Sequence, residues 1–137
     1  MALVIDSSLT LAWIYLDELT PTTLKLSHSI SETGAWVPSI WRLEVANSLQ
    51  FSIRRRRIDR AFRDQAIKDL SRLAISIDSA TDELAWTTTL ALSDHFGLTM
   101  YDACYLELAQ RRGLPLATLD NDLRKAAKAL DIPLLGV

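Results

Sequence analysis

Short apolar runs alternate with longer amphipathic stretches along the whole chain. The short runs have the length and composition of buried strands, and they fall at residues 3–6, 36–38, 75–78, 116–118 and 134–136. Between them, apolar residues recur with helical spacing, which predicts helices over residues 8–15, 21–32, 39–55, 59–73, 81–95, 101–112 and 123–130. Strands that alternate with helices favour right-handed βαβ crossovers. The pattern therefore predicts an α/β fold, with a central parallel sheet of about five short strands flanked by helices.

Glycines and prolines support these boundaries. Gly34, Gly97 and Gly113 each follow a predicted helix, where a left-handed residue commonly ends it. Pro115 and Pro133 stand at the entry to the last two strands. No GxGxxG or Walker A phosphate loop is present, and no repeat or linker interrupts the pattern. A length of 137 residues then predicts a single domain over residues 1–137.

Composition narrows the class of protein. Hydrophobic residues make up 49% of the chain and charged residues 23%, as in ordinary globular proteins. A formal net charge of −2 predicts no general affinity for nucleic acid, so a nucleic-acid role would need a local basic patch. The single cysteine, Cys104, suits a reducing compartment. No apolar run reaches the ~20 residues that a membrane span needs. We expect a cytoplasmic protein without a membrane partner.

Four acidic residues lie at or just beyond apolar segments: Asp6, Glu44, Asp102 and Asp120. A parallel sheet brings the carboxyl ends of its strands together, so these distant residues can converge. Two carboxylates ~4 Å apart repel each other by about 4 kcal/mol at an effective dielectric near 20. Such a cluster persists only with a cation or bound protons, and Mg²⁺ or Mn²⁺ suits oxygen ligands. The sequence therefore predicts a divalent metal site.

Two of these acids also have a simpler structural interpretation. Asp6 ends a strand and precedes two serines, so it could be the N-cap of the next helix. Any of Asp120, Asn121 and Asp122 could cap the final helix in the same way, and Asp122 could share or take the place of Asp120 in the metal site. Thr118, just before Asp120, could orient a carboxylate or a bound water.

Glu44 and Asp102 are harder to explain structurally. Glu44 lies too deep in its helix to be a capping-box partner, although it could be a solvated residue at the edge of a stripe. Asn47, one turn further on, shares its face and could hydrogen-bond it. Asp102 lies on a helix that is apolar nearly all round, with no basic residue three or four positions away. An interaction with the helix dipole is its alternative role.

The segments that hold these acids resemble those of PIN-domain ribonucleases, in particular the VapC-type toxins of type II toxin–antitoxin pairs. The matching segments span the chain in the family's order: Val4-Ile5-Asp6-Ser7-Ser8 with Trp13, Val37-Pro38-Ser39, Glu44-Val45-Ala46-Asn47, Gly97-Leu98-Thr99 with Tyr101-Asp102-Ala103 and Tyr105, and Leu116-Ala117-Thr118-Leu119-Asp120. The resemblance implies a PIN-like domain whose acidic pocket binds Mg²⁺ or Mn²⁺ and hydrolyses RNA phosphodiester bonds. By motif position, Asp6, Glu44, Asp102 and Asp120 match the family's acidic residues. It also implies a VapB-like antitoxin partner and a homodimer.

Two further groups of residues have both a functional and a structural interpretation. Arg54, Arg55, Arg56 and Arg57 form the strongest basic cluster. They are either a solvated helix end or a contact for RNA phosphates or an acidic partner. The four tryptophans are expected in the core, but Trp13 and Trp41, on helices either side of the second strand, could instead line the groove that the resemblance implies for an antitoxin.

Other functions fit the sequence less well. A receiver domain needs a lysine at the end of its last strand, and residues 134–137 contain none. A haloacid-dehalogenase-type phosphatase needs a second aspartate two residues after the first, where this chain has Ser8. A non-catalytic PIN-like RNA-binding or interaction module remains the alternative to an endoribonuclease. Carboxylate-dependent metal binding distinguishes the two.

Overall fold

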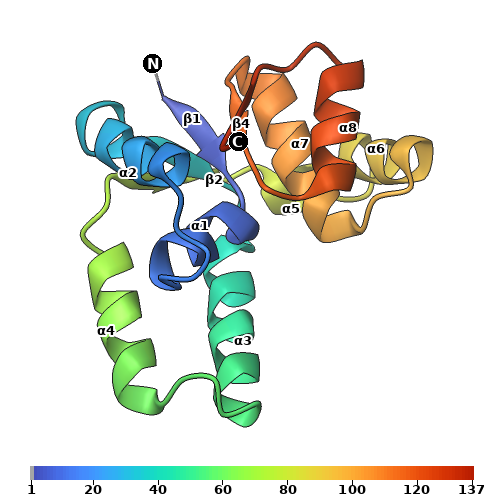
Figure 1. The fold of residues 1–137 in the computed structure, drawn as a ribbon. Coiled ribbons are helices and arrows are strands. Elements are labelled where there is room, and N and C mark those ends of the chain that lie inside the picture. Colours follow the sequence, from blue (N-terminus) through green and yellow to red (C-terminus); the bar gives the residue numbers. More distant parts are fainter. Residues whose placement is uncertain (1) are drawn as a thin grey trace.

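The chain folds around a parallel β-sheet in the computed structural model, which describes residues 2–137 (Figure 1). Its strands are β1 (Leu3–Ile5), β2 (Ala35–Val37), β3 (Ile75–Ile77), β4 (Leu116–Ala117) and β5 (Leu134–Leu135). Their spatial order is β3-β2-β1-β4-β5, and all four neighbouring pairs are parallel. The predicted α/β class and the sheet of five short parallel strands are confirmed.

Helices fill the connections between the strands. They are α1 (Ser7–Ile14), α2 (Pro21–Thr33), α3 (Trp41–Arg54), α4 (Arg60–Leu70), α5 (Thr81–Leu84), α6 (Thr88–Phe96), α7 (Met100–Arg112) and α8 (Asn121–Ala129). In Figure 1, α2 lies on one side of the sheet and α7 and α8 on the other. The chain adds β2 and β3 on one side of β1, then crosses to add β4 and β5 on the other. The boundary between β1 and β4 is therefore the topological switch point, where α/β proteins commonly bind ligands.

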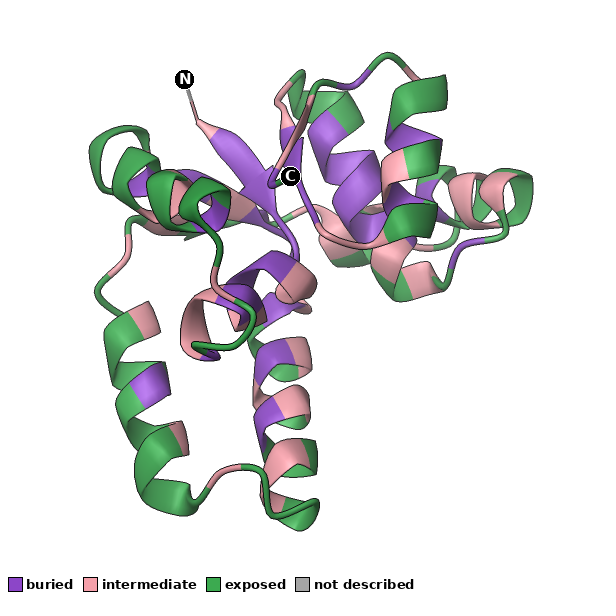
Figure 2. Ribbon diagram, viewed as in Figure 1, coloured by how far each residue is buried: buried purple, intermediate pink, exposed green. Residues whose placement is uncertain are grey.

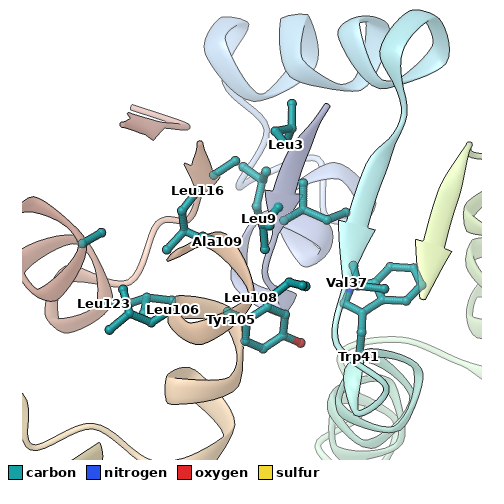
Figure 3. Packing of buried hydrophobic residues seen from close by; sticks show 14 of the residues in the cluster. Leu3, Leu9, Val37, Trp41, Tyr105, Leu106, Leu108, Ala109, Leu116 and Leu123 are labelled. Carbon is teal, nitrogen blue, oxygen red and sulfur yellow. The ribbon is translucent and has the colours of Figure 1, made fainter. Parts of the chain in front are cut away.

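The core is built around β1 and α7. Val4 of β1 pairs with Trp36 of β2 on one side and with Leu116 of β4 on the other. A strand enclosed in this way must be apolar on both faces, and all three residues of β1 are buried (Figure 2). On α7, Tyr105 and Leu106 are fully buried. Figure 3 shows the side chains of β1, β4, α1 and α7 meeting in one cluster.

A buried ion-pair network fixes the C-terminal end of α7. Asp78, which follows β3, is 1% exposed and accepts hydrogen bonds from Arg111 and Arg112 at 2.6 and 2.9 Å. Burial alone would raise the pKa of Asp78, but these guanidinium donors hold it below its ordinary value. Arg111 also binds Glu107 at 2.7 Å, and the Arg112 guanidinium lies 3.5 Å from the Trp36 ring centroid. The network ties α7 to β2 and to the end of β3, and so helps to set where its N-terminus lies.

The prediction of a single helix over residues 81–95 is wrong. Residues 81–95 form two helices, α5 and α6, instead of one. The break falls at Thr87, whose φ and ψ are −118° and −98°. Thr87, Thr88 and Thr89 are three consecutive β-branched residues, which lose side-chain freedom in a helix, and this lowers the cost of a break. Trp86, which immediately precedes Thr87, is 89% accessible, so the expectation that it is a core residue is also wrong.

Within residues 2–137, no helix is both long enough and apolar enough to cross a membrane.

Candidate active site

Asp6 is both a helix cap and a member of the acidic group. It is the first residue after β1 and is 2% exposed. Its Oδ1 accepts hydrogen bonds from the Leu9 amide at 3.0 Å and the Ser8 hydroxyl at 2.7 Å, and so caps α1. Its Oδ2 accepts from the Thr118 hydroxyl, which follows β4. Burial raises the pKa of Asp6, an effect that its hydrogen bonds oppose and the charge of Asp120 increases.

Thr118 joins the ends of the two strands at the switch point. Its hydroxyl donates to Asp6 and accepts from the Asp120 amide at 3.0 Å. Ser8 reinforces this connection, because its Oγ accepts from the Leu119 amide at 3.0 Å. Asp120 caps α8 as predicted, since its carboxylate accepts from a first-turn amide. The acids at the ends of β1 and β4 are thus held by a hydrogen-bonded bridge across the sheet edge.

Glu44 reaches the same region from α3. It is partly buried, and its Oε1 accepts a hydrogen bond from the Tyr105 hydroxyl at 2.5 Å. Tyr105 is fully buried on α7, and Figure 3 shows its ring extending toward α3. Burial raises the pKa of Glu44, the bond from Tyr105 opposes this, and the charge of Asp6 adds to it. Asn47 is exposed and lines a surface hollow with Glu44; the hydrogen-bond partner that the structure gives Glu44 is Tyr105.

Asp102 is the residue whose pKa is raised by the charges of all three other acids. It lies in the first turn of α7, where its backbone amide donates to the Thr99 cap at 3.1 Å. Burial, followed by the charges of Asp120, Asp6 and Glu44, raises the pKa of its carboxyl to about 6. The structure therefore brings three acids from three other connections within electrostatic reach of Asp102. Its first-turn position also places Asp102 where the helix dipole favours a negative charge.

Asp122 lies apart from this group. It is exposed in the first turn of α8 and borders a surface hollow with Lys125 and Lys128. Its charge is not among those that shift the pKa of Asp6, Glu44 or Asp102, whereas Asp120 acts on both aspartates. Of the two, Asp120 is the acid whose charge raises the pKa of Asp6 and of Asp102.

The donor set fits a hard divalent cation. Carboxylate oxygens are the ligands that Mg²⁺ and Mn²⁺ prefer, and a cation among Asp6, Glu44, Asp102 and Asp120 would offset the repulsion between these carboxylates. In the described residues, no three His, Cys, Asp or Glu side chains already form a group that could hold a metal ion. Mg²⁺ commonly keeps several waters and binds through one or two carboxylates, so a full protein cage is not required.

A comparison with known protein families identifies the fold. The sequence model of the PIN domain matches residues 3–129. This chain belongs to the PIN domain family. PIN domains are usually nucleases, and they generally use divalent metals. No curated protein sequence matches the chain.

Two solved structures share the fold of this PIN domain. PAE2754 from Pyrobaculum aerophilum superposes with a TM-score of 0.68 at 23% sequence identity, over 92% of this chain and 84% of that chain. FitAcB from Neisseria gonorrhoeae superposes with a TM-score of 0.65 at 13% identity, over 99% of this chain and 97% of that chain. At these identities, the similarity shows the fold alone.

The arginine cluster of this PIN domain lies at the far end of α3 from Glu44. Ten residues of helix separate Glu44 from Arg54, which is about 15 Å at 1.5 Å per residue. Arg57 makes contacts within the chain: it binds Asp17 at 2.9 Å and lies 3.9 Å from the Tyr15 ring centroid. Arg54, Arg55 and Arg56 are exposed, and the Arg55 guanidinium lies 4.3 Å from the Phe51 ring centroid.

The two candidate groove tryptophans have different environments. Trp41 is 6% exposed, and its indole donates to the Thr10 hydroxyl at 3.0 Å, which makes it a core residue. Trp13 is partly buried and donates to the Thr23 carbonyl at 2.6 Å. Each borders an apolar hollow beside α4, and the two hollows share the side chains of Leu70 and Leu73.

Several contacts at the site were not predicted from the sequence. The sequence analysis did not identify the bond from Tyr105 to Glu44, although Tyr105 lies three residues after Asp102 and so shares its helix face. It also missed the hydroxyl of Ser8, which binds both strand ends. The network around Asp78 gave no local signal, because its arginine partners lie 33 and 34 residues away.

Proposed function

We propose that this PIN domain is a metal-dependent endoribonuclease that uses Mg²⁺ or Mn²⁺ at Asp6, Glu44, Asp102 and Asp120. The observation that carries the proposal is the position of Asp102, whose pKa rises to about 6 beside the charges of the other three acids. If Asp102 belonged to a structural ion pair, a basic side chain would lie beside it in place of these acids. Membership of the PIN domain family supports the same chemistry.

The chain's own residues prepare the site for this reaction. When bound, a divalent ion lowers the pKa of its water ligand and offsets charge on the reacting phosphate. Thr118 and Ser8 direct the carboxylate of Asp6, and Tyr105 directs that of Glu44, so both are held before any ligand arrives. The proton on the Asp102 carboxyl is lost as the pH rises through about 6, which frees its oxygens for a cation near neutral pH.

The test is RNA cleavage by the Asp102→Asn variant. We expect Mn²⁺-dependent cleavage of a single-stranded RNA by the wild type and none by the variant, with circular dichroism showing that both are folded. Asp122→Asn is the matched control, because it removes an exposed first-turn carboxylate from α8 and should cleave normally. If Asp102→Asn cleaves RNA as well as the wild type, the proposed acidic site is wrong.

We propose further that the protein is the toxin of a toxin–antitoxin pair, with a VapB-like antitoxin, and that it acts as a homodimer in the cytoplasm. The shared fold with FitAcB supports a comparison with partner-bound PIN proteins, and the apolar hollows beside α4, bordered by Trp13 and Trp41, offer a surface for a partner segment.

Growth and oligomeric state test this second proposal. Expression of the wild type should arrest growth, Asp102→Asn should not, and co-expression of the product of a short reading frame that directly precedes the gene should restore growth. Light scattering of the purified protein should give the mass of a dimer. Normal growth with active wild-type enzyme would contradict the toxin assignment and leave the nuclease proposal in place.

A further inference from the structure

A surface hollow of about 320 Å³ lies beside the acidic residues, between α3 and the start of α7. Its lining consists of Ile40, Leu43, Glu44, Asn47, Ser48 and Tyr101. Two features place it next to the proposed reaction. Glu44 forms part of its wall, and Tyr101 immediately precedes Asp102 in the chain.

The lining of this hollow combines apolar surface with neutral polar groups. Tyr101 is 59% exposed and Leu43 is 74% exposed, so an aromatic ring and an aliphatic side chain both face solvent beside a group of carboxylates. Asn47 carries an amide that can both donate and accept hydrogen bonds, and the Ser48 hydroxyl can do the same. A flat, uncharged ligand with polar edges matches this combination.

The charge of the wall argues against an anionic ligand here. The carboxylate of Glu44 would repel a phosphate or an acidic side chain that entered without a cation. The base of a nucleotide is neutral, has an aromatic face, and carries donors and acceptors along its edge. Proteins commonly recognise bases of single-stranded RNA by stacking them on an aromatic side chain and hydrogen-bonding their edges.

We propose that this hollow binds the base of a nucleotide adjacent to the cleaved phosphodiester, with the Tyr101 ring stacked on the base and Asn47 at its edge. This inference rests on the proposed nuclease function. Because Tyr101 and Asp102 are consecutive residues, a base on the ring belongs to a nucleotide next to the phosphate at the acids. The hollow thus selects single-stranded substrates, since a paired base is not free to enter it.

The first test compares ring deletion with base deletion. The substrates are a short single-stranded RNA with a mapped cleavage site and two copies that are abasic on the 5′ or the 3′ side of that site. Loss of one base–aromatic stack should lower kcat/KM by about 5- to 150-fold, mainly through KM. We expect this for Tyr101→Ala on the intact RNA, whereas Tyr101→Phe should retain most of the activity. Trp86→Ala, which removes an exposed aromatic ring elsewhere, should leave kcat/KM unchanged.

The abasic RNAs decide whether the ring acts through the base. With one of them, wild type and Tyr101→Ala should have the same kcat/KM, because the ring then has no base to contact. The inference is overturned if Tyr101→Ala cleaves intact RNA normally, or if its loss of activity persists in full on both abasic RNAs.

A binding measurement separates this inference from the nuclease proposal. If the wild type cleaves no RNA with Mg²⁺ or Mn²⁺, the proposed function fails, and fluorescence anisotropy with the same RNAs then tests the hollow alone. A Kd raised about 5- to 150-fold by Tyr101→Ala, and not by Tyr101→Phe, supports base binding. An unchanged Kd contradicts it. Calorimetry with Mn²⁺ should give the same affinity for Tyr101→Ala and wild type, since the ring supplies no metal ligand.

Discussion

Replacing Asp102 with asparagine should stabilise the metal-free protein near neutral pH while removing its proposed activity. The pKa of Asp102 rises from 3.8 to about 6, chiefly through burial and then through the charges of the other acids. Each pKa unit corresponds to about 1.4 kcal/mol, so the charged carboxylate costs at most about 3 kcal/mol well above pH 6. Solvent screening at this partly exposed position lowers the cost to about 1–2 kcal/mol.

The helix dipole opposes part of the stability that Asp102→Asn gains by removing this charge. A carboxylate in the first turn of a helix contributes about 0.3–1 kcal/mol of stability, which asparagine gives up. The cap of α7 itself is kept, because the bond to Thr99 comes from the backbone amide of residue 102. We therefore expect a net gain of about 1 kcal/mol, or roughly 2–4 °C in Tm for a protein of this size.

The sign of the pH dependence follows from the raised pKa. Because the folded protein holds its proton on Asp102 more tightly than the unfolded chain does, this contribution to stability is fully present below about pH 4. It is lost as the pH rises through about 6. The two proteins should therefore have similar Tm values at pH 4, and the variant should melt at the higher temperature at pH 7.5.

Thermal unfolding with EDTA, followed by circular dichroism at both pH values, measures this difference. Adding Mn²⁺ should raise the Tm of the wild type and leave that of Asp102→Asn unchanged, since a ligand stabilises only the state that binds it. Asp122→Asn should show no gain at pH 7.5, because that exposed carboxylate lies apart from the acidic group. A metal-free Asp102→Asn variant that melts below wild type at pH 7.5 would refute the reasoning.

Three further changes test other parts of the structure. Thr118→Val removes a buried hydroxyl between two of the acids, so urea unfolding should show a loss of about 1–3 kcal/mol, and calorimetry a 10- to 100-fold weaker Mn²⁺ affinity; wild-type values would contradict its proposed role. Asp78→Asn weakens the bonds to both arginines of α7 and should cost about 2–3 kcal/mol in urea unfolding, whereas an unchanged midpoint would show that the network is not stabilising. Replacing Arg54, Arg55 and Arg56 with alanine should reduce the salt slope of single-stranded RNA binding by about 2, at ~0.7 per phosphate, and an unchanged slope would assign the cluster to structure or to a protein partner.

The central strand β1 was predictable because it is buried between two neighbouring strands. β1 lies between two neighbours and under helices, so its sequence is a short apolar run that ends at the first polar residue, Asp6. The position of Asp6 and Asp120 at strand ends explains why each residue was predicted both to cap a helix and to belong to the acidic site. Asp6 and Asp120 cap helices because each comes between a strand and a helix, and that position is also where the ends of parallel strands meet.

The contacts that orient the acids depend on tertiary structure that the sequence does not reveal. Glu44 and Tyr105 are 61 residues apart, and Thr118 and Asp6 are 112 residues apart. Their pairing is decided by how α3, α7 and β4 pack against β1. The helix predicted over residues 81–95 likewise ran through Thr87, because the helical spacing of apolar residues continues there although the helical backbone is broken. Local patterns predict where an element lies, but not which side chains meet across the core.

Calorimetric titration of the purified protein with Mn²⁺ tests the central claim most directly. The wild type should show a binding site at pH 7.5, as should Asp122→Asn. The site should be lost in Asp102→Asn and in Asp120→Asn, with both variants still folded. A wild type that binds no Mn²⁺, or an Asp102→Asn variant that binds it with wild-type affinity, would contradict the proposal that these acids form one metal site.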